Sequence, residues 1–146
     1  MITFLKPEEQ HQHKNGGGWV ANTVIIDDSV FVAPNARVYG NAWVYGNALV
    51  SGNAWVSGNA QVSGNARVFG DARVFGNDWD ETPLFIQDTR HGISNSKHGY
   101  LSIGCITLTF AEWKKQFRAL GKREGYTTAQ IKEYGLHIAY AIKVGK

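Results

Sequence analysis

The chain has 146 residues, a formal net charge of +3 and a single cysteine. This length allows one domain with an appendage, and one cysteine excludes an internal disulfide framework and a four-cysteine zinc site. A 43% hydrophobic and 12% aromatic composition argues against disorder. No apolar stretch approaches the length of a signal-peptide core or a membrane helix, so we expect a cytoplasmic protein without a membrane partner.

Residues 1–19 are predicted to form an N-terminal cap. The run of three glycines before Trp19 lacks the Lys-Ser/Thr of a phosphate-binding loop, so it indicates a turn that leads Trp19 over the first coil of the segment that follows. His11 and His13 have a spacing that two metal ligands can share. Their polar surroundings favour a solvated strand or loop instead, and no metal site is predicted.

Residues 20–79 carry a six-residue repeat with the unit Ala-x-Val-x-Gly-Asn. The valines run from Val38 to Val74, each with an alanine two residues before it, and the aliphatic register is broken at Asp80. Ala and Val share one face of a strand, because side chains alternate along it. Gly-Asn tolerates positive φ and forms a corner. A corner every six residues predicts a solenoid around a narrow Ala/Val core.

This repeat resembles that of the hexapeptide-repeat family. The resemblance implies a left-handed parallel β-helix with three hexapeptides per coil, of which residues 20–79 would make about three coils. It also implies a homotrimer, because members of the family commonly assemble with their prisms parallel. The fold expected for the whole chain is mainly β: this short β-helix, then a β-hairpin, then a C-terminal αα-hairpin.

Outward residues eighteen positions apart stack on one face of such a helix. One face carries Arg37, Trp55 and Arg73, and two guanidinium groups beside an indole suit a planar anion such as a nucleotide. A cation–π ladder satisfied within the trimer is the alternative. On the other faces, exposed apolar side chains indicate an oligomer interface formed by Phe31, Leu49, Phe69, Trp43 and Tyr45. Trp79 is expected to point outward above Trp43 and Gln61.

Residues 80–109 are predicted to be a strand pair with a polar loop. The segments 84–87 and 100–109 have strand-like composition. The intervening loop is either plain exposed loop or a second ligand-binding segment, because it contains four chemically useful side chains: Arg90, His91, Lys97 and His98. Cys105 alternates with Leu101 and Ile103, which indicates a small core residue rather than a nucleophile.

Residues 110–146 are predicted to be a two-helix appendage. Thr109 and Thr127 each begin a capping box, which opens helices that extend to about Lys122 and Val144. Residues 105–146 hold eight basic and three acidic residues, and thus the whole positive excess. Basic helices of this kind suit a host protein as partner. Nucleic acid is not favoured, because the link between the helices is not diagnostic of a DNA reader.

The arrangement as a whole also resembles small hexapeptide-repeat proteins of bacteriophages and prophages. That resemblance rests on GGWV before the repeats, on PLFIQDTRH and IGC after them, and on EW and EGYTTAQIKEY in the predicted helices. It implies a phage-encoded protein that works in the cytoplasm of a bacterial host.

Many hexapeptide-repeat proteins are CoA-dependent acyltransferases that use a histidine base. Here no histidine lies between Lys14 and Arg90, and the repeats contain no insertion, so we expect no catalytic residues and no cofactor. We predict a non-catalytic homotrimer that captures a small anionic or nucleotide-like ligand, as a counter-defence sponge for a host signal. One alternative is an acyltransferase that uses acetyl-CoA with His91 or His98 as base. The other is a structural or host-protein-binding adaptor.

Overall fold

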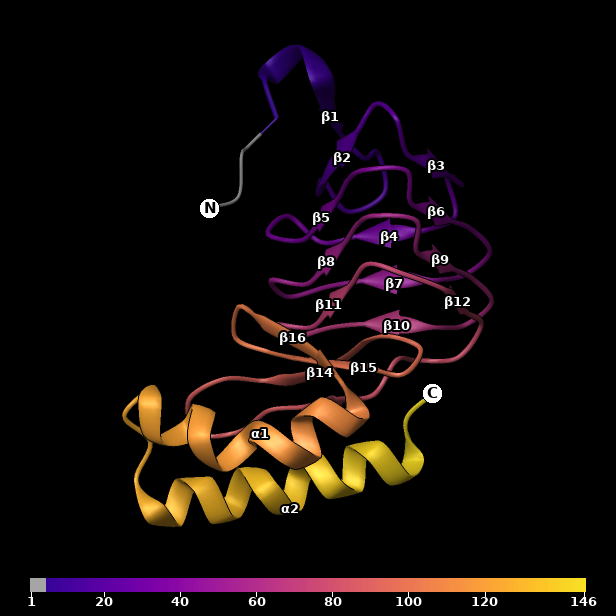
Figure 1. Cartoon of the computed structure of the whole chain (residues 1–146). Coiled ribbons are helices and arrows are strands. Elements are labelled where there is room, and N and C mark those ends of the chain that lie inside the picture. The colour runs from indigo at the N-terminus through magenta and orange to yellow at the C-terminus, as the bar shows by residue number, and fades with distance from the viewer. Residues whose placement is uncertain (1–4) are drawn as a thin grey trace. The chain divides into compact units, whose positions relative to one another are not determined.

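The computed structural model describes residues 5–146, so that the first four residues of the predicted cap lie outside the described residues. It divides the chain into two compact units, Met1–Pro83 and Leu84–Lys146. The first is a parallel β-solenoid of about three turns, and the second combines an antiparallel sheet with two helices (Figure 1).

The solenoid confirms the predicted repeat. From residue 19 to residue 74 its strands pair in parallel and in register with the strand eighteen residues away, and its inward alanines and valines are buried. Three sheets result. One contains β2 (Trp19–Ala21), β5 (Arg37–Val38), β8 (Trp55–Val56) and β11 (Arg73–Val74); the second contains β3 (Ile25–Ile26), β6 (Trp43–Val44), β9 (Gln61–Val62) and β12 (Asp78–Trp79); the third contains β4 (Phe31–Val32), β7 (Leu49–Val50) and β10 (Arg67–Val68).

The corners depend on glycine for two reasons. Gly52 has φ +59°, in the left-handed region, and a Cβ at this position would lie 2.9 Å from the carbonyl oxygen of Gly70 in the next coil. The coils are that close because their backbones bond directly, as where the Asn53 amide donates to the Gly70 carbonyl at 2.9 Å. Both the turn and the stacking distance therefore exclude a side chain.

The last corner breaks the six-residue register. At Gly76–Asn77 the positive φ moves from glycine to asparagine, with Asn77 at +65°. The shift turns Asp78 outward and Trp79 inward, so the expectation of an outward Trp79 is wrong. Its side chain is buried, and its indole Nε1 donates to the Gly76 carbonyl at 2.8 Å. A large indole thus takes the position that valine holds in the earlier coils.

The N-terminal segment covers the first sheet edge. After the 3₁₀ turn η1 (Pro7–Glu9), β1 (Gln10–Gln12) pairs antiparallel with β2. His13 is buried and donates from Nε2 to the Val30 carbonyl, so the expectation of a solvated side chain is wrong for His13. Trp19 does not cover the first coil as expected. It stands on the outer side of β2, because Val20 takes the inward position.

The second unit contains both predicted helices. They are α1 (Phe110–Arg123) and α2 (Thr128–Val144), and each begins at its predicted capping box. The pKa of Glu112 is lowered by the hydrogen bonds that its carboxylate accepts from Thr109. The helices pack through Trp113, Tyr134 and Ile138 on the sheet residues Ile93 and Leu101. Among residues 5–146, no helix is both long and apolar enough to cross a membrane.

The sheet of this unit has four strands, two more than the expected pair. They are β13 (Phe85–Ile86), β14 (Ile93–Lys97), β15 (Tyr100–Ile103) and β16 (Ile106–Thr109), in that order. Strand β14 lies inside the expected polar loop. It is buried despite its Ser and Asn residues because their side chains bond internally: Asn95 Nδ2 donates to the carbonyls of Lys97, Tyr100 and Lys146, and Ser96 bonds to Ser102.

The long expected strand 100–109 is in fact two strands with a turn between them. Gly104, with φ +59°, lies in this turn. The turn interrupts the alternation that placed Cys105 in the core, and Cys105 is exposed. The interpretation of Cys105 as a core residue is therefore wrong.

Replacing a corner glycine should destabilise the solenoid by more than the cost of placing a side chain on a residue with positive φ. Gly17 also has a positive φ, but a Cβ there meets nothing within 4 Å, so Gly17→Ala is a matched control. We expect Gly17→Ala to lower the free energy of unfolding by about 1 kcal/mol and Gly52→Ala by about 2–4 kcal/mol, because only the latter forces coils apart. Urea unfolding of both variants measures the difference, and equal losses would contradict the stacking argument.

Candidate functional site

The predicted Arg/Trp face of the solenoid forms a continuous column. Trp19 pairs in register with Arg37, Arg37 with Trp55, and Trp55 with Arg73. We call these four residues the Arg/Trp column. Trp19 was not part of the sequence prediction, because it was expected to turn away over the end of the coil. It extends the alternation of indole and guanidinium by one position.

Stacking within the column is direct. The guanidinium carbon of Arg73 lies 4.4 Å from the centre of the Trp55 ring, a cation–π contact. Tyr39 packs edge-on against the same indole, with ring centres 6.5 Å apart and planes at 73°. Trp55 is half-buried by these neighbours. The column therefore combines aromatic and cationic side chains on one surface, with Arg73 in direct contact with Trp55.

The residues predicted for the oligomer interface lie on the other two sheets and their edges. Phe31 and Leu49 stack in register on β4 and β7, and Phe69 directly follows β10. Trp43 lies on β6, 5.3 Å from Tyr45 between ring centres. Trp43 and Phe69 are 44% and 43% exposed, whereas Leu49 and Tyr45 are half-buried. The exposed Ile25 next to Trp43 adds to this apolar surface.

The four residues of the expected polar loop do not share one place in the second unit. Arg90 and His91 precede β14, where the Arg90 guanidinium carbon lies 4.2 Å from the centre of the Tyr126 ring and the His91 ring is 6.5 Å from it. Lys97 and His98 follow at the other end of β14. There the Lys97 ammonium stacks over Tyr100 at 4.2 Å. Most of β14, whose last residue is Lys97, separates the two pairs.

Next to Arg90 is a histidine–carboxylate pair that the sequence analysis did not single out. His137 Nδ1 lies 2.5 Å from Asp88 Oδ2, and the Asp88 side chain is fully buried. Glu133, one helical turn before His137, is the third member of this group. The Glu-x-x-x-His spacing on a predicted helix was the signal available in the sequence. Asp88 gave none, because it lies in a segment assigned to a loop.

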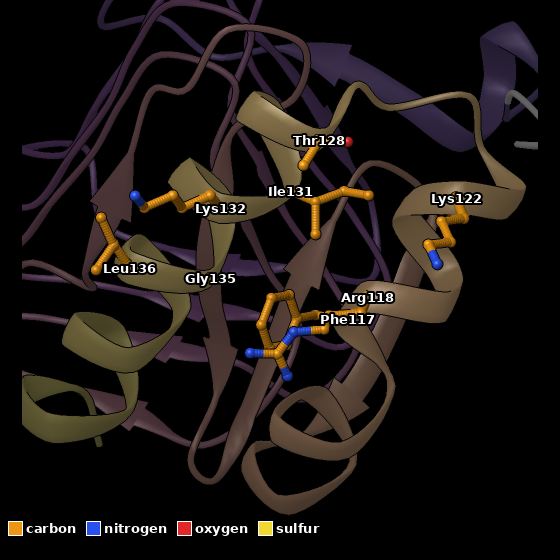
Figure 2. A pocket seen from close by; sticks show the side chains of 8 residues that line it. All are labelled: Phe117, Arg118, Lys122, Thr128, Ile131, Lys132, Gly135 and Leu136. Carbon is orange, nitrogen blue, oxygen red and sulfur yellow. The ribbon is translucent and has the colours of Figure 1, made fainter.

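A groove of about 540 Å³ runs between α1 and α2 (Figure 2). Phe117, Ile131 and Gly135 form its apolar floor. The two helices can approach closely here because Gly135 has no side chain; a Cβ at this position would lie 2.6 Å from the Phe117 ring. Three cations stand around it. Arg118 stacks on Phe117 at 4.6 Å, and Lys122 and Lys132 lie on opposite sides in Figure 2. The remaining lining residues are Thr128 and Leu136.

Comparison with known proteins supports the solenoid and nothing beyond it. Residues 42–58 and 60–76 match the model of the YdcK beta solenoid repeat. The two matches begin eighteen residues apart, which is one coil of the structure, and together they cover less than a quarter of the chain. No curated protein and no solved structure matches the chain. The chain thus carries the repeats of a β-solenoid family.

The cluster around Tyr126 makes a prediction about alkaline pH. Burial, followed by the neighbouring Tyr134 hydroxyl, raises the pKa of Tyr126 to about 12, and Arg90 opposes this rise. The folded state therefore holds the Tyr126 proton more tightly than an unfolded chain, in which the pKa is 10. This contribution to stability is complete below pH 10 and is lost as the pH rises towards about 12.

Absorbance titration of the wild type minus Tyr126→Phe isolates this hydroxyl from the other tyrosines. We expect a difference curve with a midpoint near 12, and a smaller loss of stability above pH 10 in Tyr126→Phe. A difference curve centred at the ordinary tyrosine value would contradict the packing of Tyr126 against Tyr134.

Proposed function

We propose that this chain is a non-catalytic binding protein that captures a small planar anion, of the nucleotide class, on the Arg/Trp column. The alternation of indole and guanidinium in register along one sheet is the observation that carries this proposal. Indoles stack on aromatic bases, and guanidinium groups pair with phosphate through two parallel N–H bonds.

The dimensions of the column suit such a ligand. Stacked strands lie about 4.8 Å apart, so that Arg37 and Arg73, which flank Trp55, are separated by roughly 10 Å along the face. A nucleotide whose base lies near an indole of the column can reach the neighbouring guanidinium with its phosphate. Arg73 contacts the Trp55 ring. A guanidinium that stacks on a ring through its face can still pair with phosphate through its edge.

Self-association as a homotrimer belongs to the same proposal. The support is a set of exposed apolar side chains on the two sheets beside the Arg/Trp column: Ile25 and Trp43 on one sheet, and Phe31 and Phe69 on and beside the other.

The ligand class that we propose is a nucleotide messenger of a bacterial defence system, held without turnover by a phage-encoded protein. This step rests on the resemblance to small phage hexapeptide-repeat proteins. The lack of histidine between Lys14 and Arg90 fits a protein that sequesters its ligand rather than transforming it.

Calorimetric titration with a panel of linear and cyclic nucleotides tests the proposal. We expect one member to bind and to be recovered unchanged, and Arg73→Gln to weaken its binding by about 10- to 100-fold, because a charge-assisted phosphate contact is lost. Arg67→Gln is the matched control, since Arg67 points outward from β10 on a different sheet.

Native mass spectrometry of freshly purified protein reports the stoichiometry and any retained small molecule together. Absence of heat with every nucleotide, equal weakening in the two arginine variants, or turnover of the ligand would each contradict capture at the column. A monomer at micromolar concentration would contradict the trimer alone.

A second candidate function is that of an adaptor that binds an acidic host protein through the groove between α1 and α2. The observation that favours it is the apolar floor with Arg118, Lys122 and Lys132 around it. An amphipathic helix with acidic flanks is complementary to such a groove in shape and in charge.

We expect Lys132→Glu to abolish capture of such a partner from a bacterial lysate, because it reverses a charge beside the groove. Lys114→Glu should leave capture intact, since Lys114 is exposed on α1 and does not line the groove. Quantitative mass spectrometry of the bound fractions compares the variants. If no protein is lost selectively in Lys132→Glu, the adaptor function is contradicted.

A further inference from the structure

Three potential metal ligands converge in the second unit. Asp88, Glu133 and His137 each offer one ligand atom, and the three atoms lie within 4.8 Å of one another. Glu133 and His137 stand four residues apart on α2, so they share one face of the helix. Asp88 reaches them from the segment that precedes β14.

The charge balance of this group calls for a cation. Two carboxylates meet one imidazole, and within residues 5–146 no lysine or arginine forms a salt bridge with Asp88 or Glu133. Arg90 is close in sequence, but its guanidinium stacks on Tyr126 and donates to the Glu124 carbonyl. Because the Asp88 side chain is fully buried, solvent does not compensate its charge.

The supporting contacts hold the ligands in place. The Thr89 amide donates to Asp88 Oδ1 at 2.7 Å, which leaves Oδ2 directed at His137. The Tyr134 hydroxyl accepts from the amides of Arg90 and His91 and donates to the His91 carbonyl, so the 88–91 segment is fastened to α2. Metal sites depend on such surrounding hydrogen bonds to orient their ligands.

We propose that Asp88, Glu133 and His137 bind one divalent transition-metal ion of the zinc class. An imidazole with two carboxylates suits Zn²⁺, Co²⁺ or Mn²⁺, whereas Mg²⁺ and Ca²⁺ prefer all-oxygen sets. Ligand atoms bonded at about 2.0–2.2 Å to one ion are roughly 3 Å apart, so binding replaces the contact between Asp88 and His137 with a small outward movement. Three protein ligands leave a position for water. The proposal is independent of the Arg/Trp column, because all its residues lie in the second unit.

The test is titration of the tag-free full chain with Zn²⁺ by calorimetry and with Co²⁺ by visible absorbance. We expect one ion per chain at micromolar affinity or tighter, with Mg²⁺ at least tenfold weaker. Glu133→Gln should weaken Zn²⁺ binding by at least tenfold while keeping the contact between Asp88 and His137. His137→Gln should weaken Co²⁺ binding and change the position and intensity of its visible absorption bands, because the imidazole ligand is lost.

Two control variants separate this site from other metal contacts. Glu124→Gln makes the same charge change at an exposed glutamate of the same unit, and His11→Asn removes the exposed histidine of the N-terminal segment. Both should bind Zn²⁺ as the wild type does. The proposal is overturned if the wild type binds no stoichiometric ion, if Glu133→Gln binds unchanged, if Mg²⁺ binds as tightly as Zn²⁺, or if His11→Asn abolishes binding. Circular dichroism confirms that each variant is folded before titration.

Discussion

Backbone hydrogen bonds between one coil and the next constrain the whole first unit. They bring corners together so closely that the carbonyl of Gly70 accepts from the Asn53 amide, with no room for a side chain on Gly52. They also keep residues eighteen apart at the same place on a face. The Arg/Trp column is a direct product of this constraint, because the register of the backbone aligns Trp19, Arg37, Trp55 and Arg73.

Much of this could be predicted from the sequence, because a six-residue period with fixed residue types indicates a solenoid, and the resemblance to hexapeptide-repeat proteins implies three repeats per coil. The prediction was wrong where the period ends. Trp79 was assigned outward by counting, but one residue of slip at Asn77 turned it into the core, and the identity of a residue does not reveal a slip. Both helices of the second unit were predicted for the same reason as the solenoid: their capping boxes and apolar spacing are local signals.

Strand β14 and the group around Asp88 could not be predicted, because both depend on contacts between distant segments. Asn95 is polar and is flanked by serines, a composition that is typical of a loop. It is buried because its amide bonds to three carbonyls, one of them at Lys146. In the same way, Asp88 becomes a candidate site residue only because the fold places His137 of α2 next to it. Short-range patterns predict elements, whereas sites assembled from remote segments require the tertiary structure.

The indole of Trp79 also has a consequence for the length of the solenoid. Coils that keep the six-residue register present the same buried residues to their neighbours. A tandem duplication of eighteen residues would therefore add one coil without disturbing the core. Such a duplication would lengthen each outer face by one strand and would repeat the side chains that this face exposes. The slip at Gly76–Asn77 ends this freedom, because the buried Trp79 fills the place where the next valine would stack. It acts as a stop, so growth of the protein by duplication is confined to the coils that precede it.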